Sequence, residues 1–280
     1  MKKILVIILA LATILSFSAC YDDGGRNAQI ENDNVDDSVD DETPKQNTSV
    51  IRASGTDQGV NWVFYEDGEL VISGWSEMGN GNVNASSYDW HDFCDYITKV
   101  TITEGVMNIS DSAFEGCINL ESVYMADTVT EIGDSAFSGC EKLSIIKLSN
   151  NLTFMGRSAF QGCNSIRDIK FPVGIEDICG FDYCSGLTSV TIPSGVTDIG
   201  VSAFYNCINL SEIYIPETVE NIYKNAFDNC TNLTDIYYEG DETAWLAVRG
   251  YYTGIQSNGF ECIGDFLPDT ITVHYNSTMP

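Results

Sequence analysis

A short pattern of apolar and small residues recurs along the middle of the chain at a nearly fixed interval. Its copies place six phenylalanines in one register and a cysteine three residues after each, and the interval is 23 residues except for one step of 21. The residues are Phe114, Phe137, Phe160, Phe181, Phe204 and Phe227, with Cys117, Cys140, Cys163, Cys184, Cys207 and Cys230. A period of about 20 to 30 residues is typical of a solenoid, in which no coil buries its apolar face without neighbours. The pattern therefore predicts a stack of coils.

Each repeat contains one strand whose apolar residues recur at i, i+3 and i+5. Positions i+3 and i+5 lie on one face of a pleated strand, and position i lies at the corner where the chain enters it. The predicted strands are residues 97–102, 120–125, 143–148, 166–171, 187–192, 210–215 and 233–238. Stacking predicts one parallel sheet of seven strands, with the phenylalanines inside the coils.

The rest of each repeat reads as a short extended piece followed by a single helical turn. In one copy, residues 129–133 form the extended piece, Asp134 and Ser135 offer caps for the turn, and Gly139 ends it. The positions that match Gly139 hold Gly116, Gly162, Asn206 and Asn229. Glycine and asparagine both tolerate a left-handed backbone, so a tight turn is predicted at this point of every coil.

One coil and the C-terminal region depart from the period. Two residues are missing before Phe181, and Tyr183 occupies the Gly/Asn position, so we expect a kink there. After residue 238 the period is lost, and residues 239–280 are predicted to form an irregular C-terminal cap that includes the apolar stretch 271–275.

The region before the array, residues 55–96, reads as an N-terminal cap. Two apolar runs flank the turn signal at residues 66–68, which predicts a hairpin. Solenoids need atypical end pieces, and Trp62, Trp75 and Trp90 are bulky enough to cover the open end of the core. The alternative is that the three tryptophans line a ligand pocket.

The first 19 residues read as a secretory signal, with two lysines followed by an apolar run too short to span a membrane. Small residues leading into Cys20 resemble the lipobox of bacterial lipoproteins, although Phe17 replaces the leucine most often found there. The resemblance implies that Cys20 carries lipid and anchors the protein outside the cytoplasmic membrane. The alternative is ordinary cleavage near Ala19. Residues 20–54 are rich in Asp and Glu, and this composition predicts a disordered linker.

The chain as a whole is strongly acidic, with 13 Lys and Arg against 41 Asp and Glu and a formal net charge of -28. Binding to phosphate groups depends on Lys and Arg, so nucleic acid and anionic membrane surfaces are poor partners. The acidic linker lacks the ordered pattern of a calcium loop, and we predict no metal site and no cofactor.

The ten cysteines do not read as a disulfide framework, because six of them belong to the repeat. Cysteines that recur at one position of a repeat more often form a column of small buried side chains than a set of redox-active thiols. Cys94, Cys179 and Cys262 lie in the flanks or in the irregular coil, and a bridge between Cys179 and Cys184 stays open.

The repeat unit resembles the BspA-like leucine-rich repeat of bacterial surface proteins. The copy at residues 196–216 carries the full motif, from Val196 and Ile199 through Phe204 and Cys207 to Pro216, and the resemblance covers residues 97–238. It implies an α/β, mostly β, leucine-rich-repeat solenoid with a parallel strand and a short helical turn per repeat. It also implies a surface role, since members are often thought of as adhesins that bind host matrix proteins or other microbes.

An enzymatic role is not expected. The two histidines, His91 and His274, lie in opposite caps, and six coil steps of about 4.8 Å put them on the order of 30 Å apart. They cannot share a catalytic site, and no zinc spacing or phosphate loop is visible. Paired carboxylates of the kind used in glycoside hydrolysis remain formally open.

Two columns of strand residues are expected to point away from the core. The first column is Thr101, Tyr124, Lys147, Lys170, Thr191, Tyr214 and Tyr237, and the second column is Lys99, Ser122, Ile145, Asp168, Ser189, Glu212 and Asp235. A passive spacer of the cell envelope would show small or uniformly charged residues there, whereas a binding surface shows aromatic rings and mixed charge.

We therefore predict that the sheet face binds an extracellular protein or glycan and that the protein is a monomer. The predicted binding residues are Tyr124, Lys147, Asp168, Lys170, Glu212, Tyr214 and Tyr237. Lys147 and Lys170 are expected on successive strands about 4.8 Å apart, where they would meet acidic groups. The alternative is a passive structural component in which tyrosine and lysine are simply tolerated on an exposed sheet.

Overall fold

The structure is a computed structural model that describes residues 49–57, 59–79, 88–250, 261–262 and 271–278. The predicted signal segment, Cys20 and most of the acidic linker lie outside the described residues. Within the described part of the chain, no helix is long and apolar enough to cross a membrane.

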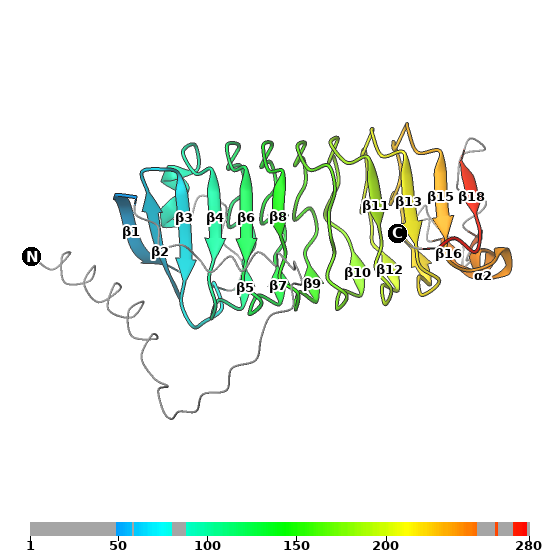
Figure 1. Ribbon diagram of the computed structural model, residues 1–280, viewed down its shortest axis with the longest axis horizontal. Coiled ribbons are helices and arrows are strands. Elements are labelled where there is room, and N and C mark those ends of the chain that lie inside the picture. The colour runs from blue at the N-terminus through cyan, green and yellow to red at the C-terminus, as the bar shows by residue number, and fades with distance from the viewer. Residues whose placement is uncertain (1–48, 58, 80–87, 251–260, 263–270, 279–280) are drawn as a thin grey trace, which may run out of the picture. The chain divides into compact units, whose positions relative to one another are not determined.

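The described chain from residue 49 onward winds into coils whose long strands lie side by side (Figure 1). The strands are β1 (Ile51–Asp57), β2 (Val60–Tyr65), β3 (Glu69–Ser73), β4 (Lys99–Ile102), β5 (Asn108–Ile109), β6 (Ser122–Met125), β7 (Glu131–Ile132), β8 (Ile145–Lys147), β9 (Phe154–Met155), β10 (Asp177–Ile178), β11 (Ser189–Thr191), β12 (Asp198–Ile199), β13 (Glu212–Ile215), β14 (Asn221–Ile222), β15 (Asp235–Tyr238), β16 (Arg249–Gly250), β17 (Glu261–Cys262) and β18 (Thr272–His274). The described helices are a 3-10 helix at Asp89–Phe93 and α2 (Glu242–Ala247).

The predicted hairpin is confirmed and becomes part of the main sheet. β2 and β3 pair antiparallel, and Gly68 between them has a φ of 92°, in the left-handed region. β3 then pairs in parallel with β4, so the cap continues the stack of long strands. β1, which the sequence did not predict, pairs with β2 and begins at Ile51, inside the segment assigned to the linker.

Each coil also contributes a short strand, where the sequence predicted an extended piece. These short strands form two parallel arrays along the opposite side of the coils, in the orders β5-β7-β9 and β10-β12-β14-β16, with β17 added antiparallel at the end. Ile132 and Ile178 on these strands are fully buried, whereas Phe154 on β9 is exposed.

The long strands form two sheets rather than the single sheet of seven that was predicted. β1, β2, β3, β4, β6 and β8 form one sheet, β11, β13, β15 and β18 form another, and residues 166–171 between them pair with neither. Figure 1 shows this segment without an arrow between β8 and β11. The short-strand sheets break at the same place, between β9 and β10. The 21-residue step of the repeat, from Phe160 to Phe181, lies in the same region of the chain.

The phenylalanine column fills the core as predicted. Five of its members are fully buried: Phe114, Phe137, Phe160, Phe181 and Phe204. Adjacent rings are stacked with centroids 5.2 to 6.0 Å apart, and the stack continues to the partly buried Phe227. Buried rings therefore connect every coil of the array to the next.

The predicted helical turn is wrong, because the chain before each phenylalanine forms non-helical turns. Ser135 has a φ of 57°, and Ser112, Ser158 and Ser202 adopt the same left-handed conformation. The Asp134 carboxylate accepts from the backbone N–H of Arg157 in the next coil, at 2.7 Å, rather than capping its own turn. The second left-handed position is confirmed, with φ values of 75° at Gly139 and 61° at Tyr183.

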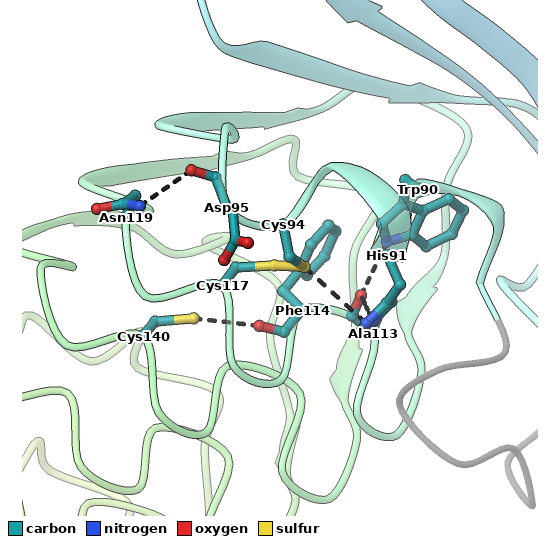
Figure 2. The surroundings of a disulfide bond; sticks show 9 residues. All are labelled: Trp90, His91, Cys94, Asp95, Ala113, Phe114, Cys117, Asn119 and Cys140. Carbon is teal, nitrogen blue, oxygen red and sulfur yellow. Dashed lines mark hydrogen bonds between the residues drawn. A yellow bond between two sulfur atoms is a disulfide. The ribbon is translucent and has the colours of Figure 1, made fainter.

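The cysteine column is a ladder of buried thiols that ends in a disulfide. The Cys140 thiol donates to the carbonyl of Phe114 at 3.2 Å, and Cys163, Cys184, Cys207 and Cys230 make the equivalent bond one coil later each time. Cys117 was predicted to be a packing thiol, and this is wrong, since it forms a disulfide with Cys94 (Figure 2).

The repeat itself explains this disulfide. Cys94 lies 23 residues before Cys117, so the N-terminal cap contains an irregular first coil of the array. Stacking brings the two Cα atoms to 4.5 Å, within the range that a disulfide spans. Cys179 and Cys184 do not bridge, because their thiols point to different carbonyls, those of Met155 and Phe160.

The ends of the core are closed by tryptophans, although not by all three that were predicted. Trp90 is fully buried, stacks on Phe114 with centroids 6.0 Å apart, and donates its indole N–H to the Ala113 carbonyl at 2.8 Å (Figure 2). Trp62 is also buried, but Trp75 is 80% exposed, so the prediction for Trp75 is wrong. At the other end, Trp245 on α2 is buried against Tyr238.

Candidate functional site

The candidate site is the solvent-facing side of the long strands β4, β6, β8, β11, β13, β15 and β18, which we call the long-strand face. The two predicted columns are aligned on it by the strand registers. In the first column, Thr101 lies opposite Tyr124 and Tyr124 opposite Lys147, and farther along Thr191 lies opposite Tyr214 and Tyr214 opposite Tyr237. Successive members of a column on paired strands therefore lie side by side on this face.

The interruption at residues 166–171 divides this face into two halves. Tyr124 and Lys147 lie on the first half, and Tyr214 lies on the second with Tyr237 and Glu212. Asp168 and Lys170 lie on the unpaired segment between the halves. Lys147 and Lys170 were predicted on adjacent paired strands, and this is wrong, because no pairing joins β8 to that segment.

The first half carries lysines, and polar contacts join some of the side chains on its neighbouring strands. Lys99 Nζ lies 3.1 Å from Glu69 Oε1 on β3 and 5.3 Å from the ring centroid of Tyr124 on β6. The Thr101 hydroxyl donates to the same Glu69 oxygen at 2.7 Å. Lys147 is exposed, and no ion pair involves it within the described ranges.

The second half carries a stack of three rings, Tyr214, Tyr237 and His274, which we call the ring ladder. The centroids of Tyr214 and Tyr237 are 4.6 Å apart with an interplanar angle of 11°, and those of Tyr237 and His274 are 4.6 Å apart at 13°. The rings belong to β13, β15 and β18, whose registers place them opposite one another. Their stacking follows from the parallel pairing of the three strands.

His274 was not predicted as part of this face, although a signal for it exists. The apolar residues Ile271, Val273 and Tyr275 alternate, which places His274 on the opposite side of its strand. His274 Nε2 lies 2.7 Å from Asp235 Oδ1. Hydrogen bonding from His274, and then from Thr234, lowers the pKa of the Asp235 carboxyl below its ordinary value.

Acidic groups accompany the ring ladder in the second column. Glu212 lies on β13 two residues before Tyr214 and opposite Asp235 on β15. Burial against its neighbours raises the pKa of the Tyr214 phenol, and the Glu212 carboxylate raises it further. The long-strand face therefore changes character along the array, from lysines in its first half to carboxylates and stacked rings in its second.

A hollow of about 300 Å³ opens where the two halves meet. It is lined by Asp168, Ile169, Lys170, Phe171, Thr191 and Pro193, that is, by the unpaired segment and by the start of the second sheet. Two predicted binding residues, Asp168 and Lys170, thus share one hollow.

The described residues contain no group of three or more His, Cys, Asp or Glu side chains that could hold a metal ion. The two histidines lie in different parts of the array, His91 in the 3-10 helix before β4 and His274 in β18. His91 Nε2 lies 3.2 Å from the Ala113 carbonyl, and burial lowers the pKa of its imidazole.

Comparison with known proteins gives one family and a set of related structures. The BspA type leucine-rich repeat region matches in six copies over residues 85–180 and 175–244, which together span more than half of the chain. A search of curated proteins finds no match. A crystal structure of a leucine-rich repeat protein from Eubacterium ventriosum ATCC 27560 is 22% identical with a TM-score of 0.54, over 66% of this chain and 72% of that chain. The Leucine Rich Repeat protein of T. pallidum is 26% identical with a TM-score of 0.49, over 66% of this chain and 81% of that chain. The first of these likenesses shows the same solenoid fold.

Proposed function

The chain belongs to the BspA-type leucine-rich repeat family, and from this premise we propose that it binds an extracellular partner, a protein or a glycan, through its long-strand face. Proteins built from leucine-rich repeats are generally interaction modules. The fold by itself does not name a partner, so the proposal depends on what this particular face presents.

The ring ladder is the observation that carries the proposal. Tyr214, Tyr237 and His274 are only partly buried, so three rings in register stand at the solvent side of a sheet. Aromatic residues are enriched at protein interfaces because they bring large contact area with little loss of side-chain freedom. Cross-strand stacking also stabilises the sheet, so binding must be tested separately from stability.

The distribution of charge also supports the long-strand face as the binding surface, and it makes the two ends of that face different. Lys147 and Lys170 are exposed near the middle of a chain of net charge -28, and Glu212 and Asp235 lie beyond them on the second half. A passive spacer would have no use for opposite charges in a fixed order. The partner is expected to place acidic groups over the lysines, where complementary charge favours correct orientation.

We also propose that the protein is not an enzyme and that it is held at the cell surface by lipid on Cys20. Support for the anchor comes from the signal-like first 19 residues and the small residues that precede Cys20. Radiolabelled palmitate should enter the wild-type protein and be absent from Cys20→Ala. Equal labelling of the two proteins would contradict the anchor.

A screen of polysaccharides and peptides for turnover would contradict the non-enzymatic assignment if any were cleaved.

The binding proposal is tested by a screen of the full-length protein against extracellular matrix proteins and glycans. The screen is repeated with Lys147→Glu/Lys170→Glu and with Tyr214→Ala/Tyr237→Ala, after melting curves have shown which variants remain folded. We expect each double variant to lose at least tenfold in affinity for any ligand found. A ligand that both folded variants bind as well as wild type would place the site elsewhere, in the caps or on the short strands.

A further inference from the structure

The disulfide between Cys94 and Cys117 lies at the end of the thiol ladder, and His91 occupies the next position of that ladder (Figure 2). His91 lies 23 residues before Phe114 and three before Cys94, which is the spacing of phenylalanine and cysteine in the repeats. The Cys94 N–H donates to the His91 carbonyl at 3.1 Å. One coil later, the Cys117 N–H donates to the Phe114 carbonyl at 3.2 Å. The His91 carbonyl therefore lies where the next acceptor of the ladder belongs.

The two ring nitrogens of His91 have different roles. Nε2 lies 3.2 Å from the Ala113 carbonyl, which can only accept, so Nε2 carries the proton of the neutral imidazole. Nδ1 is then an acceptor, and it lies 3.9 Å from the Cys94 sulfur. Burial, which lowers the pKa of the imidazole, favours this neutral form. A sulfur in a disulfide has no proton, so Nδ1 has no donor among the described residues while the bond to Cys117 is intact.

Reduction of the disulfide supplies the missing donors. A Cys94 thiol can donate to His91 Nδ1 across the sulfur–nitrogen contact that is already present. The Cys140 thiol donates to the Phe114 carbonyl. By the same step, a Cys117 thiol donates to the carbonyl one coil earlier, which is that of His91. Both thiols of the reduced pair thus have acceptors on one residue, and both redox states fit the same backbone.

We propose that Cys94 and Cys117, with His91 beside them, form a redox-active pair that small dithiols reduce and small disulfides reoxidise in the folded protein. The reagent enters at Cys94, which is 8% exposed, because Cys117 is fully buried. None of these residues belongs to the long-strand face, so the pair is a second site and does not depend on the proposed binding of a partner.

The exchange balances in both directions. A thiolate of the dithiol attacks the Cys94 sulfur, the bond to Cys117 breaks, and the second reagent thiolate then closes the reagent's own disulfide and releases Cys94. The protein disulfide gains the two electrons that the dithiol loses, and the two protons of the dithiol end on the two protein thiols. In reoxidation, His91 Nδ1 takes the proton of the Cys94 thiol, and the resulting thiolate attacks the reagent disulfide. Cys117 then displaces the reagent, and both protons leave with the reduced reagent.

The neighbouring thiol of the ladder is excluded from this exchange. Cys140 is fully buried, its proton is held by the Phe114 carbonyl, and burial raises the pKa of its thiol to about 12. It therefore forms almost no thiolate at neutral pH. Reoxidation should re-form the bond between Cys94 and Cys117 and leave Cys140 free.

The first test uses the full-length wild-type protein without denaturant. The protein is equilibrated with mixtures of reduced and oxidised dithiothreitol, the exchange is stopped with acid, and the unfolded protein is alkylated with N-ethylmaleimide. Peptide mass spectrometry then reports Cys94, Cys117 and Cys140 separately. Cys94 and Cys117 should be reduced together and reoxidised along the same curve, with an unchanged circular dichroism spectrum, and Cys140 should be a free thiol in every mixture.

The second test isolates the role of Nδ1 with His91→Gln. The glutamine amide nitrogen can keep the bond to the Ala113 carbonyl, but nothing replaces the acceptor beside Cys94. At about pH 7, oxidised dithiothreitol should re-form the disulfide at least fivefold faster in wild type than in His91→Gln, and the difference should vanish near pH 10, where thiols ionise without a base. Cys140→Ser is the control, because its hydroxyl keeps the bond to Phe114, and it should react at the wild-type rate.

Three results would overturn the inference. One is a disulfide that dithiothreitol reduces only after urea has unfolded the protein, and this result needs no variant. Another is an equal rate of reoxidation in wild type and in His91→Gln at about pH 7. The third is reoxidation that joins Cys117 to Cys140, which would show that the ladder, and not the pair beside His91, carries the exchange.

Discussion

Removing one ring from the middle of the phenylalanine column should destabilise the whole array. Phe137 is fully buried, and its ring is stacked between Phe114 and Phe160, with centroids 5.2 Å away on each side. Both neighbours are held by their own coils, so the space left by Phe137→Ala cannot close. Substitutions of this kind lower the free energy of unfolding by about 3 to 5 kcal/mol, and two lost ring contacts place this one in the upper part of that range.

The assay is urea denaturation followed by circular dichroism, with the same measurement on Phe154→Ala as the control. Phe154 is 54% exposed on the short strand β9, so its removal should change the free energy of unfolding by no more than about 0.5 kcal/mol. A coil that loses its ring contacts with both neighbours is coupled to them more weakly, so the Phe137→Ala transition should broaden. Equal midpoints for the two variants would refute the argument that this column holds the coils together.

Three further outcomes follow from the side chains around the column and the ladder. Cys94→Ser should lower the free energy of unfolding by about 3 kcal/mol relative to the oxidised wild type, because the bond to Cys117 closes a 23-residue loop, and non-reducing denaturation curves measure it. Burial raises the pKa of the Cys140 thiol to about 12, so iodoacetamide at pH 8 should label Cys140 only after urea unfolds the protein, as peptide mass spectrometry would show. The hydrogen bond to His274 lowers the pKa of Asp235 below its ordinary value of 3.8. The contribution of this bond to the stability of the fold is therefore fully present above pH 3.8 and is lost as the pH falls through the lowered pKa. The melting temperature of Asp235→Asn should therefore fall less steeply than that of wild type below about pH 4.

Much of the fold was predictable because stacking forces equivalent residues into contact. The spacing of Phe137 and its equivalents gave the buried ring column, and Gly139 and its equivalents marked a left-handed turn. Residues 166–171 carry the same apolar pattern as the paired strands, so their failure to pair was not visible in their own sequence.

The disulfide and the turns show what spacing alone cannot decide. Cys94 lies at the repeat interval from Cys117, and a stacked thiol and a bridged one have the same spacing in sequence. The structure separates the two cases by the partner of each sulfur: the Cys140 thiol donates to the Phe114 carbonyl, whereas the sulfurs of Cys94 and Cys117 bond to each other. Asp134 and Ser135 suggested a helix cap, yet in a stack of coils the nearest unpaired backbone N–H belongs to the next coil, and the Asp134 carboxylate bonds there.

The candidate site was predicted in part. The strand registers confirm the alignment of the first column within each half, including Tyr214 beside Tyr237, but Lys170 lies on the unpaired segment and is aligned with neither half. Sequence reasoning did not find His274, because it lies beyond the last repeat and joins the ladder only when β18 pairs with β15. The hollow beside Lys170 and Thr191 was not predictable either, since it arises from the unpaired segment.

The most direct test of the account is the dissociation constant of the full-length protein for the tightest partner found in the screen. It is measured for wild type, for Tyr214→Ala/Tyr237→Ala on the long-strand face, and for Phe154→Ala on the short strands. The account predicts at least a tenfold rise in the dissociation constant for the tyrosine double variant and no change for Phe154→Ala. Unchanged affinity in the folded double variant, or a loss confined to Phe154→Ala, would contradict the claim that the long-strand face is the binding surface.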